Sequence, residues 1–188
     1  MTQNNYNKYS KNEDNRPFKE KYRIYIYPVI AAWLVTMFFR PITADGAAML
    51  PGVKDGEVII VVNHTYSAKR GTPDFGQVVA FRDDFISEGE EGENTIRRVI
   101  GLPGDEIEIR DGSVYRNGEL LSEEYITGTT EGEVGPITIP EDEVFVLGDN
   151  REESIDSRDP RVGSLKMKAI RGYCAVTVWP LSEIGKVK

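Results

Sequence analysis

Few side chains in this chain of 188 residues can serve as a nucleophile or a base. There is one histidine, His64, and one cysteine, Cys174. A single cysteine excludes an intrachain disulfide and any zinc site built from several thiolates. The hydroxyls of Ser67, Ser154 and Ser157 have no histidine or lysine at a helpful position in the sequence. The residue types therefore give no indication of a Ser–His or Cys–His nucleophilic pair.

Other isolated features have ordinary structural explanations. His64 is predicted to face solvent, although Asn63-His64-Thr65 also fits the acceptor pattern for N-glycosylation. Cys174 alternates with apolar neighbours, which predicts a small core hydrophobe. Six acidic residues lie between positions 83 and 93. They lack the ligand spacing of a calcium loop, so we expect a solvated loop, no metal and no cofactor.

A run of sixteen uncharged residues from Ile24 to Phe39 stands out near the N-terminus. A membrane-spanning helix needs about 17–25 apolar residues, so this run is at the short end. We predict a transmembrane signal anchor over residues 22–40, a polar cytoplasmic tail over 1–21 and an extracytoplasmic domain over 41–188. A buried core helix and a cleaved signal peptide are the alternatives.

The charge is distributed unevenly along the chain. Residues 1–40 contain seven Lys/Arg and three Asp/Glu, a net charge of +4, whereas residues 41–188 carry a net charge of −12. The excess of cations before the apolar run predicts a cytoplasmic N-terminus in a single-pass protein of the cell membrane. Membrane lipid is thus an expected partner of the anchor, and the acidic body argues against nucleic acid.

Beyond Arg40 the apolar residues alternate with polar ones or come in short runs bounded by glycine-containing turns. This pattern is typical of strands in an antiparallel sheet, and it predicts an all-β body with no helix longer than a turn or two. The expected strands cover residues 57–62, 77–82, 97–101, 106–110, 113–118, 136–139, 143–148 and 173–180.

Three segments, in this order, resemble a known family. They are DGAAMLP at 45–51, IRRVIGLPGDEIEI at 96–109 and PEDEVFVLGDNREESIDSRDPRVG at 140–163. The chain resembles type I signal peptidases, the membrane-anchored serine proteases that cut leader peptides from exported proteins. The resemblance runs from the apolar segment to Trp179. It implies the antiparallel β fold of that family, with a large core and a small β insertion over about 103–140.

The resemblance also implies a Ser/Lys dyad, and this sequence departs from it at both positions. Ala48 occupies the place of the serine in Ser-Met-x-Pro, and Arg97 occupies the place of the lysine that acts as general base. A methyl group cannot attack a carbonyl, and a guanidinium with a pKa above about 12 stays protonated. We therefore expect no catalytic residues, only the positions of a lost dyad.

The rest of the family's site is retained in this sequence. In the family, the serine matching Ser154 orients the base, Asp156 and Arg158 match a supporting ion pair, and Met49 matches a residue of the substrate cleft. We expect Arg97 to be buried and paired with Asp156, because a carboxylate without its cation would be uncompensated. A solvent-facing arginine on a strand is the alternative. The cleft and support residues are Met49, Pro51, Ser154, Asp156 and Arg158.

These observations indicate a protein that binds peptides without cutting them. Inactive relatives of signal peptidases accompany pilus assembly on Gram-positive cells, which favours a non-proteolytic chaperone or scaffold in pilus or surface-protein assembly. Its expected partners are a pilin or another exported protein in extended form, and a sortase. Two alternatives are an active signal peptidase in which Ala48 is an engineered knockout, and a regulatory subunit of an active signal peptidase.

Overall fold

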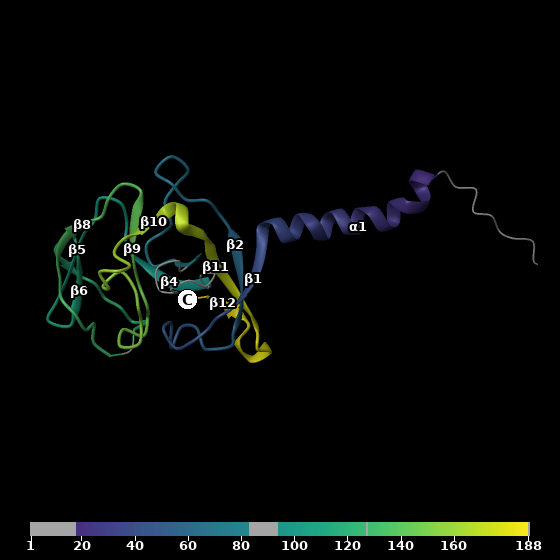
Figure 1. Cartoon of the computed structure of the whole chain (residues 1–188). Coiled ribbons are helices and arrows are strands. Elements are labelled where there is room, and N and C mark those ends of the chain that lie inside the picture. Colours follow the sequence, from purple (N-terminus) through teal and green to yellow (C-terminus); the bar gives the residue numbers. More distant parts are fainter. Residues whose placement is uncertain (1–17, 83–93, 127, 188) are drawn as a thin grey trace, which may run out of the picture. The chain divides into compact units, whose positions relative to one another are not determined.

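The computed structural model describes residues 18–82, 94–126 and 128–187 (Figure 1). The chain divides after Thr36 into two compact units. The predicted acidic loop at 83–93 lies outside the described residues.

The first unit contains helix α1 (Phe18–Phe38), which is 21 residues long and includes Pro28. The predicted anchor covers residues 22–40, whereas the helix begins at Phe18 and stops at Phe38, and strand β1 begins at Phe39. Pro41 explains this boundary, since the residue before a proline is driven out of the helical region. Among the described residues, no helix combines the length and the apolar character needed to cross a membrane.

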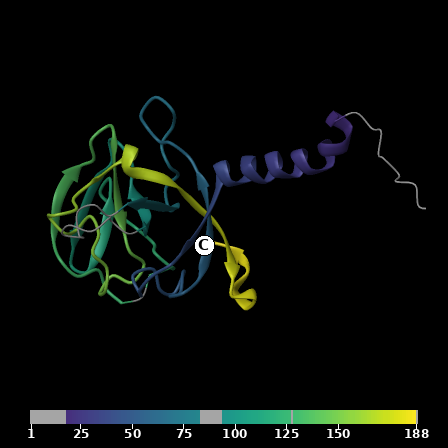
Figure 2. The same ribbon diagram turned by 45° about the vertical axis from the view of Figure 1, so that its right-hand side comes forward.

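The second unit is made of two antiparallel sheets (Figures 1 and 2). The larger has the strand order β1-β2-β11-β3-β4-β9-β10, with β12 also paired to β11, and the smaller has the order β7-β6-β5-β8. The strands are β1 (Phe39–Thr43), β2 (Val58–Asn63), β3 (Val78–Arg82), β4 (Asn94–Gly101), β5 (Glu106–Arg110), β6 (Ser113–Arg116), β7 (Glu119–Leu120), β8 (Val134–Thr138), β9 (Glu143–Leu147), β10 (Leu165–Lys166), β11 (Ile170–Trp179) and β12 (Gly185–Lys186). Two 3₁₀ turns, η1 (Met167–Ala169) and η2 (Leu181–Glu183), are the only other helical elements described.

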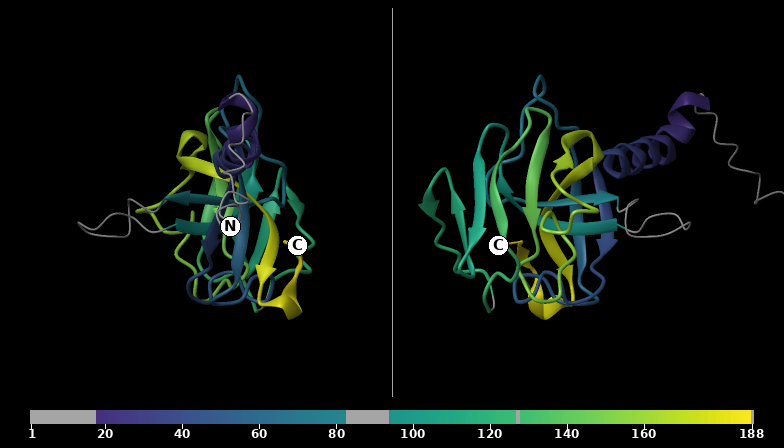
Figure 3. Two further views of the ribbon diagram at one scale, coloured as in Figure 1. Left: turned by 90° about the vertical axis from the view of Figure 1, so that its right-hand side faces the viewer. Right: turned by 60° about the vertical axis from the view of Figure 1, so that its left-hand side comes forward.

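The smaller sheet falls within the predicted insertion at about 103–140. Its first hairpin turns at Asp111-Gly112 and its second at Asn117-Gly118, and all four residues have positive φ. Paired left-handed residues of this kind match the right-handed twist of the strands they join. Further views place this sheet, in teal and green, on the side of the unit away from β1 (Figure 3).

The sheets enclose three clusters of buried apolar side chains. One of them joins β1, β2 and β3 to Met49 and Val53, which are 3% and 2% exposed. Cys174 belongs to the same cluster, so the prediction that it is a core hydrophobe is confirmed. This cluster matters for function because it anchors the turn that follows β1.

Candidate active-site cleft

Two backbone hydrogen bonds stabilise the turn that carries Ala48. The amide of Leu50 donates to the Ala47 carbonyl at 3.1 Å, and the amide of Val53 donates to the Met49 carbonyl at 2.8 Å. Met49 and Val53 point into the core, while Ala48 stays half-buried. The segment after β1 adopts this turn because the apolar side chains of Met49 and Val53 pack into the core.

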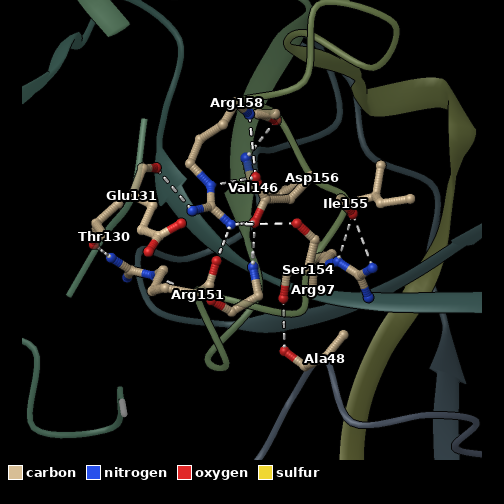
Figure 4. A network of polar contacts seen from close by, with 12 residues as sticks. Ala48, Arg97, Thr130, Glu131, Val146, Arg151, Ser154, Ile155, Asp156 and Arg158 are labelled. Atoms are coloured by element: carbon tan, nitrogen blue, oxygen red, sulfur yellow. Dashed lines mark hydrogen bonds and ion pairs between the residues drawn. The ribbon is translucent and has the colours of Figure 1, made fainter. Parts of the chain in front are cut away.

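Arg97 lies on β4, next to the cleft, and is 8% exposed. Its Nε and Nη2 donate to the Ile155 carbonyl at 3.1 and 2.8 Å (Figure 4). Its Nη1 donates to the Ile96 carbonyl at 2.7 Å. Ala48 and Arg97 line one cavity of about 90 Å³. The structure thus brings together positions 48 and 97, at which the sequence departs from the Ser/Lys dyad that the resemblance implies.

The side-chain hydroxyl of Ser154 contacts the backbone of the Ala48 turn. Its Oγ lies 3.0 Å from the Ala48 carbonyl oxygen and 2.6 Å from that of Asn150, and one hydroxyl proton serves one of them at a time. The Asn150 amide also donates to the Ala48 carbonyl, at 3.0 Å. Gly148 makes this close approach possible, because a Cβ there would lie 1.8 Å from the Ser154 Oγ.

Asp156 and Arg158 form the ion pair that the resemblance implies. Arg158 Nε lies 2.9 Å from Asp156 Oδ1, and its Nη2 lies 2.9 Å from Oδ2 (Figure 4). The amide of Gly148 donates to the same carboxylate at 3.0 Å. This pair therefore fixes the loop that carries Ser154 against the end of β9.

The predicted pairing of Arg97 with Asp156 is wrong. Arg158 holds the Asp156 carboxylate, and the guanidinium of Arg97 turns to the carbonyl of the residue before it, Ile155. The solvent-facing alternative is wrong as well, because the side chain is buried. Arg97 meets the right loop but binds its backbone rather than its carboxylate.

The structure places the remaining predicted residues unevenly. Met49 lines the cavity with Ala48, whereas Pro51 lines a separate pocket of about 680 Å³ that also contacts Tyr125 and Thr177. His64 is exposed, as predicted, and its ring lies 4.5 Å from the ring of Tyr66. Among the described residues that line the Ala48 cavity there is neither a lysine nor a histidine.

Sequence reasoning missed a second buried ion pair beside the cleft. Arg98 Nε and Nη2 donate to the two Asp149 carboxylate oxygens at 2.8 and 2.5 Å. Burial raises the pKa of Asp149, although the hydrogen bonds from Arg98 oppose that shift. A Cβ on Gly52 would lie 2.9 Å from this carboxylate, so the pair supports the far end of the Ala48 turn. Opposite charges on the neighbouring segments β4 and 148–151 were the available signal.

Two strand edges border the cavity. The Ala44 amide and carbonyl pair with Glu57 and Gly56, so the backbone groups of Thr43 and Asp45 point away from β2. On β4, pairing with β9 begins only at Arg98, and no described strand covers residues 94–97 on that side. Residues 44–46 and 94–97 both line the cavity, so two strand edges to which the described residues add no further strand lie beside it.

Comparison with known proteins gives consistent results. The family model described as "Signal peptidase, peptidase S26" matches residues 19–179. A signal peptidase I of Bacillus licheniformis is 32% identical over 189 residues, covering 94% of this chain and 96% of the relative. A signal peptidase I of Bacillus amyloliquefaciens is 33% identical over 178 residues, covering 88% and 89%.

Among solved structures, a signal peptidase I from Enterococcus faecalis V583 shares 30% sequence identity and superposes with a TM-score of 0.44 over 56% of this chain and 98% of its own. The family model spans most of the sequence, and relatives of about one-third identity cover nearly all of it. The chain therefore belongs to the signal peptidase family, peptidase S26.

Proposed function

We propose that this chain is a non-proteolytic member of its family, which holds exported proteins in an extended form without cutting them. The observation that carries the proposal is the pair of side chains at the cavity. Ala48 offers a methyl group where a nucleophile is required, and Arg97 offers a protonated guanidinium where a base is required. Loss of one essential member of a catalytic triad already lowers kcat by about 10⁶ in a serine protease.

The hydrogen bonds of Arg97 strengthen this argument. A general base accepts a proton, so its side chain must be partly deprotonated near neutral pH. A lysine reaches that state when burial lowers its pKa. Arg97 instead carries a guanidinium, which does not deprotonate in proteins, and it donates from three nitrogens to carbonyl oxygens. Arg97 therefore acts as a structural link between β4 and the Ile155 loop.

Peptide binding requires only the cleft. An extended peptide adds a strand to an exposed sheet edge by backbone hydrogen bonds, and pockets between alternate side chains give specificity. The edges at 43–45 and 94–97, along which the described residues add no further strand, present backbone groups beside one cavity. A client segment with small side chains suits a cavity of about 90 Å³.

The biological setting follows from the resemblance to inactive relatives in pilus assembly. In this setting the chain is a chaperone or scaffold for a pilin or another surface protein, working beside a sortase on a Gram-positive cell. In this proposal we assign membrane attachment to the uncharged run Ile24–Phe39 as a single-pass anchor, with residues 1–21 cytoplasmic and the β unit extracytoplasmic, although α1 does not have the length and apolar character of a spanning helix. Protease protection of tagged termini in intact cells tests that orientation.

A second function, active leader-peptide cleavage, is favoured by the intact support network. Asp156 is paired with Arg158, Ser154 contacts the Ala48 carbonyl, and the relatives named above are called signal peptidase I. In that case Ala48 is an engineered substitution. The two functions differ in what the unmodified chain does to a preprotein.

The test uses the full chain in detergent micelles with a synthetic preprotein. We expect no cleavage by the unmodified chain and measurable cleavage by the double variant Ala48→Ser/Arg97→Lys. The matched control Ala47→Ser/Arg97→Lys adds the same hydroxyl one residue away and should stay inactive. Cleavage by the unmodified chain that scales with protein concentration would refute the proposal.

A further inference from the structure

The backbone of β4 alternates in direction at the cleft. The amide of Val99 donates to the Gln77 carbonyl on β3, and Arg97 lies opposite Val79 on the same side. Successive residues of a strand direct their backbone groups to opposite sides. The amide and carbonyl of Ile96 therefore point away from β3, toward the edge that no described strand covers.

The carbonyl on that edge already has a donor. Nη1 of Arg97 lies 2.7 Å from the Ile96 oxygen. Its Nε and Nη2 donate to the Ile155 oxygen (Figure 4). The planar guanidinium thus bridges two carbonyls and fills the space between them. Because Arg97 is 8% exposed, this contact lies in a site that water enters poorly.

We propose that Arg97 caps the peptide-binding edge of β4, so that an added strand pairs with Asn94 and stops short of Ile96. The inference rests on the proposed peptide binding and specifies its register. A peptide N–H that approaches the Ile96 oxygen also approaches the N–H groups of the Arg97 guanidinium. Both are hydrogen-bond donors, so they do not bind each other. The bound segment is therefore held by the outer part of the edge, one hydrogen-bond pair farther from Ala48.

The Arg97 side chain also stabilises the geometry of the cleft. By joining the Ile96 and Ile155 carbonyls, Arg97 ties β4 to the loop whose next residue, Asp156, is held by Arg158. Peptide affinity is thus reduced at one backbone position while the geometry of the other positions is preserved. A substitution that only damaged the fold would lower affinity at every position.

The experiment measures binding of a fluorescent leader peptide to the full chain in detergent micelles, by anisotropy. A set of peptides, each N-methylated at one backbone amide, reports which N–H groups donate. We expect Arg97→Ala to bind the parent peptide about 2- to 12-fold more tightly, the worth of one net backbone hydrogen bond. One additional amide should become sensitive to N-methylation in that variant.

Two further variants keep the test decisive. Arg97→Lys retains the charge without the fork and should give an intermediate gain, which provides a readout if Arg97→Ala does not fold by circular dichroism. Arg110→Ala removes an exposed cation from the smaller sheet and should change nothing.

The outcomes separate the two proposals. Equal affinities and identical N-methylation profiles in the unmodified chain and both Arg97 variants would overturn the cap while leaving peptide binding intact. Binding by an Arg97 variant but not by the unmodified chain would support the cap in its strongest form. Absence of binding by every form would overturn strand addition, and the cap with it.

Discussion

The buried pair of Arg98 and Asp149 gives a sharp test of how the cleft is supported. The side chains of the two residues are 5% and 1% exposed, and their nitrogen and oxygen atoms approach to 2.5 Å. Arg98 also donates to the Gly76 carbonyl at 2.9 Å and lies 4.3 Å from the ring centre of Tyr125. Substitution Arg98→Met keeps much of the side-chain volume and removes the cation.

The expected cost follows from the burial. Removing one partner of a buried ion pair costs about 3–5 kcal/mol, because the remaining charge is left uncompensated. In a chain of this size, 1 kcal/mol shifts the melting temperature by about 2–4 °C, which gives a loss of about 6–20 °C. Burial raises the pKa of Asp149, and without Arg98 the carboxyl takes up a proton more readily. The cost should therefore fall as the pH is lowered.

The free energy of unfolding is measured by urea denaturation of the full chain, followed by circular dichroism at pH 7 and pH 5. The double variant Arg98→Met/Asp149→Asn completes a mutant cycle and should recover part of the loss, since no buried charge remains. Arg161→Met, which breaks the exposed pair with Asp159, is the matched control and should cause no measurable loss. A loss below about 1 kcal/mol for Arg98→Met at pH 7 would refute the reasoning.

Two more outcomes follow from close packing and burial. Gly148→Ala would put a Cβ 2.6 Å from the Ala48 carbonyl oxygen as well as against Ser154, so it should lower the free energy of unfolding by about 1–3 kcal/mol or more, whereas the control Gly135→Ala faces open space; equal melting curves for Gly148→Ala and the unmodified chain would contradict this. Burial raises the pKa of Cys174 to about 12 from 9.0, so iodoacetamide at pH 8 should label this thiol only after unfolding. Because the folded pKa is the higher one, stability should decline as the pH rises above about 9, and rapid labelling of the native chain would contradict the assignment.

Local patterns in the sequence were sufficient for much of the β body. Alternating apolar residues located most strands of both sheets, and the dipeptides Asp111-Gly112 and Asn117-Gly118 located two hairpin turns. The apolar run continues through Phe39, but the helix ends at Phe38 and Phe39 already belongs to the strand that contains Pro41. Hydrophobicity marks a segment, but backbone restriction decides where it ends.

Partner choice within the cleft was harder to predict. The pair Asp156–Arg158 was expected because the two residues are close in the sequence and match a known motif. The partner of Arg97 was not, because a guanidinium selects among all oxygens within its reach, and a backbone carbonyl leaves no mark in the sequence. The contact of Arg98 with Asp149 joins residues 51 positions apart and was missed because nothing in the sequence shows that these two segments meet in the fold.

The sequence alone determined that position 48 carries a methyl group and position 97 a guanidinium, whose chemistry is the same wherever they lie. It also determined an antiparallel β body, because a period of two can bury only one face of a strand. The tertiary structure decided that residues 44–46 and 94–97 border the same cavity, and which carbonyls Arg97 binds. Those facts depend on the approach of segments that are far apart in the chain, and only folding brings them within hydrogen-bond distance.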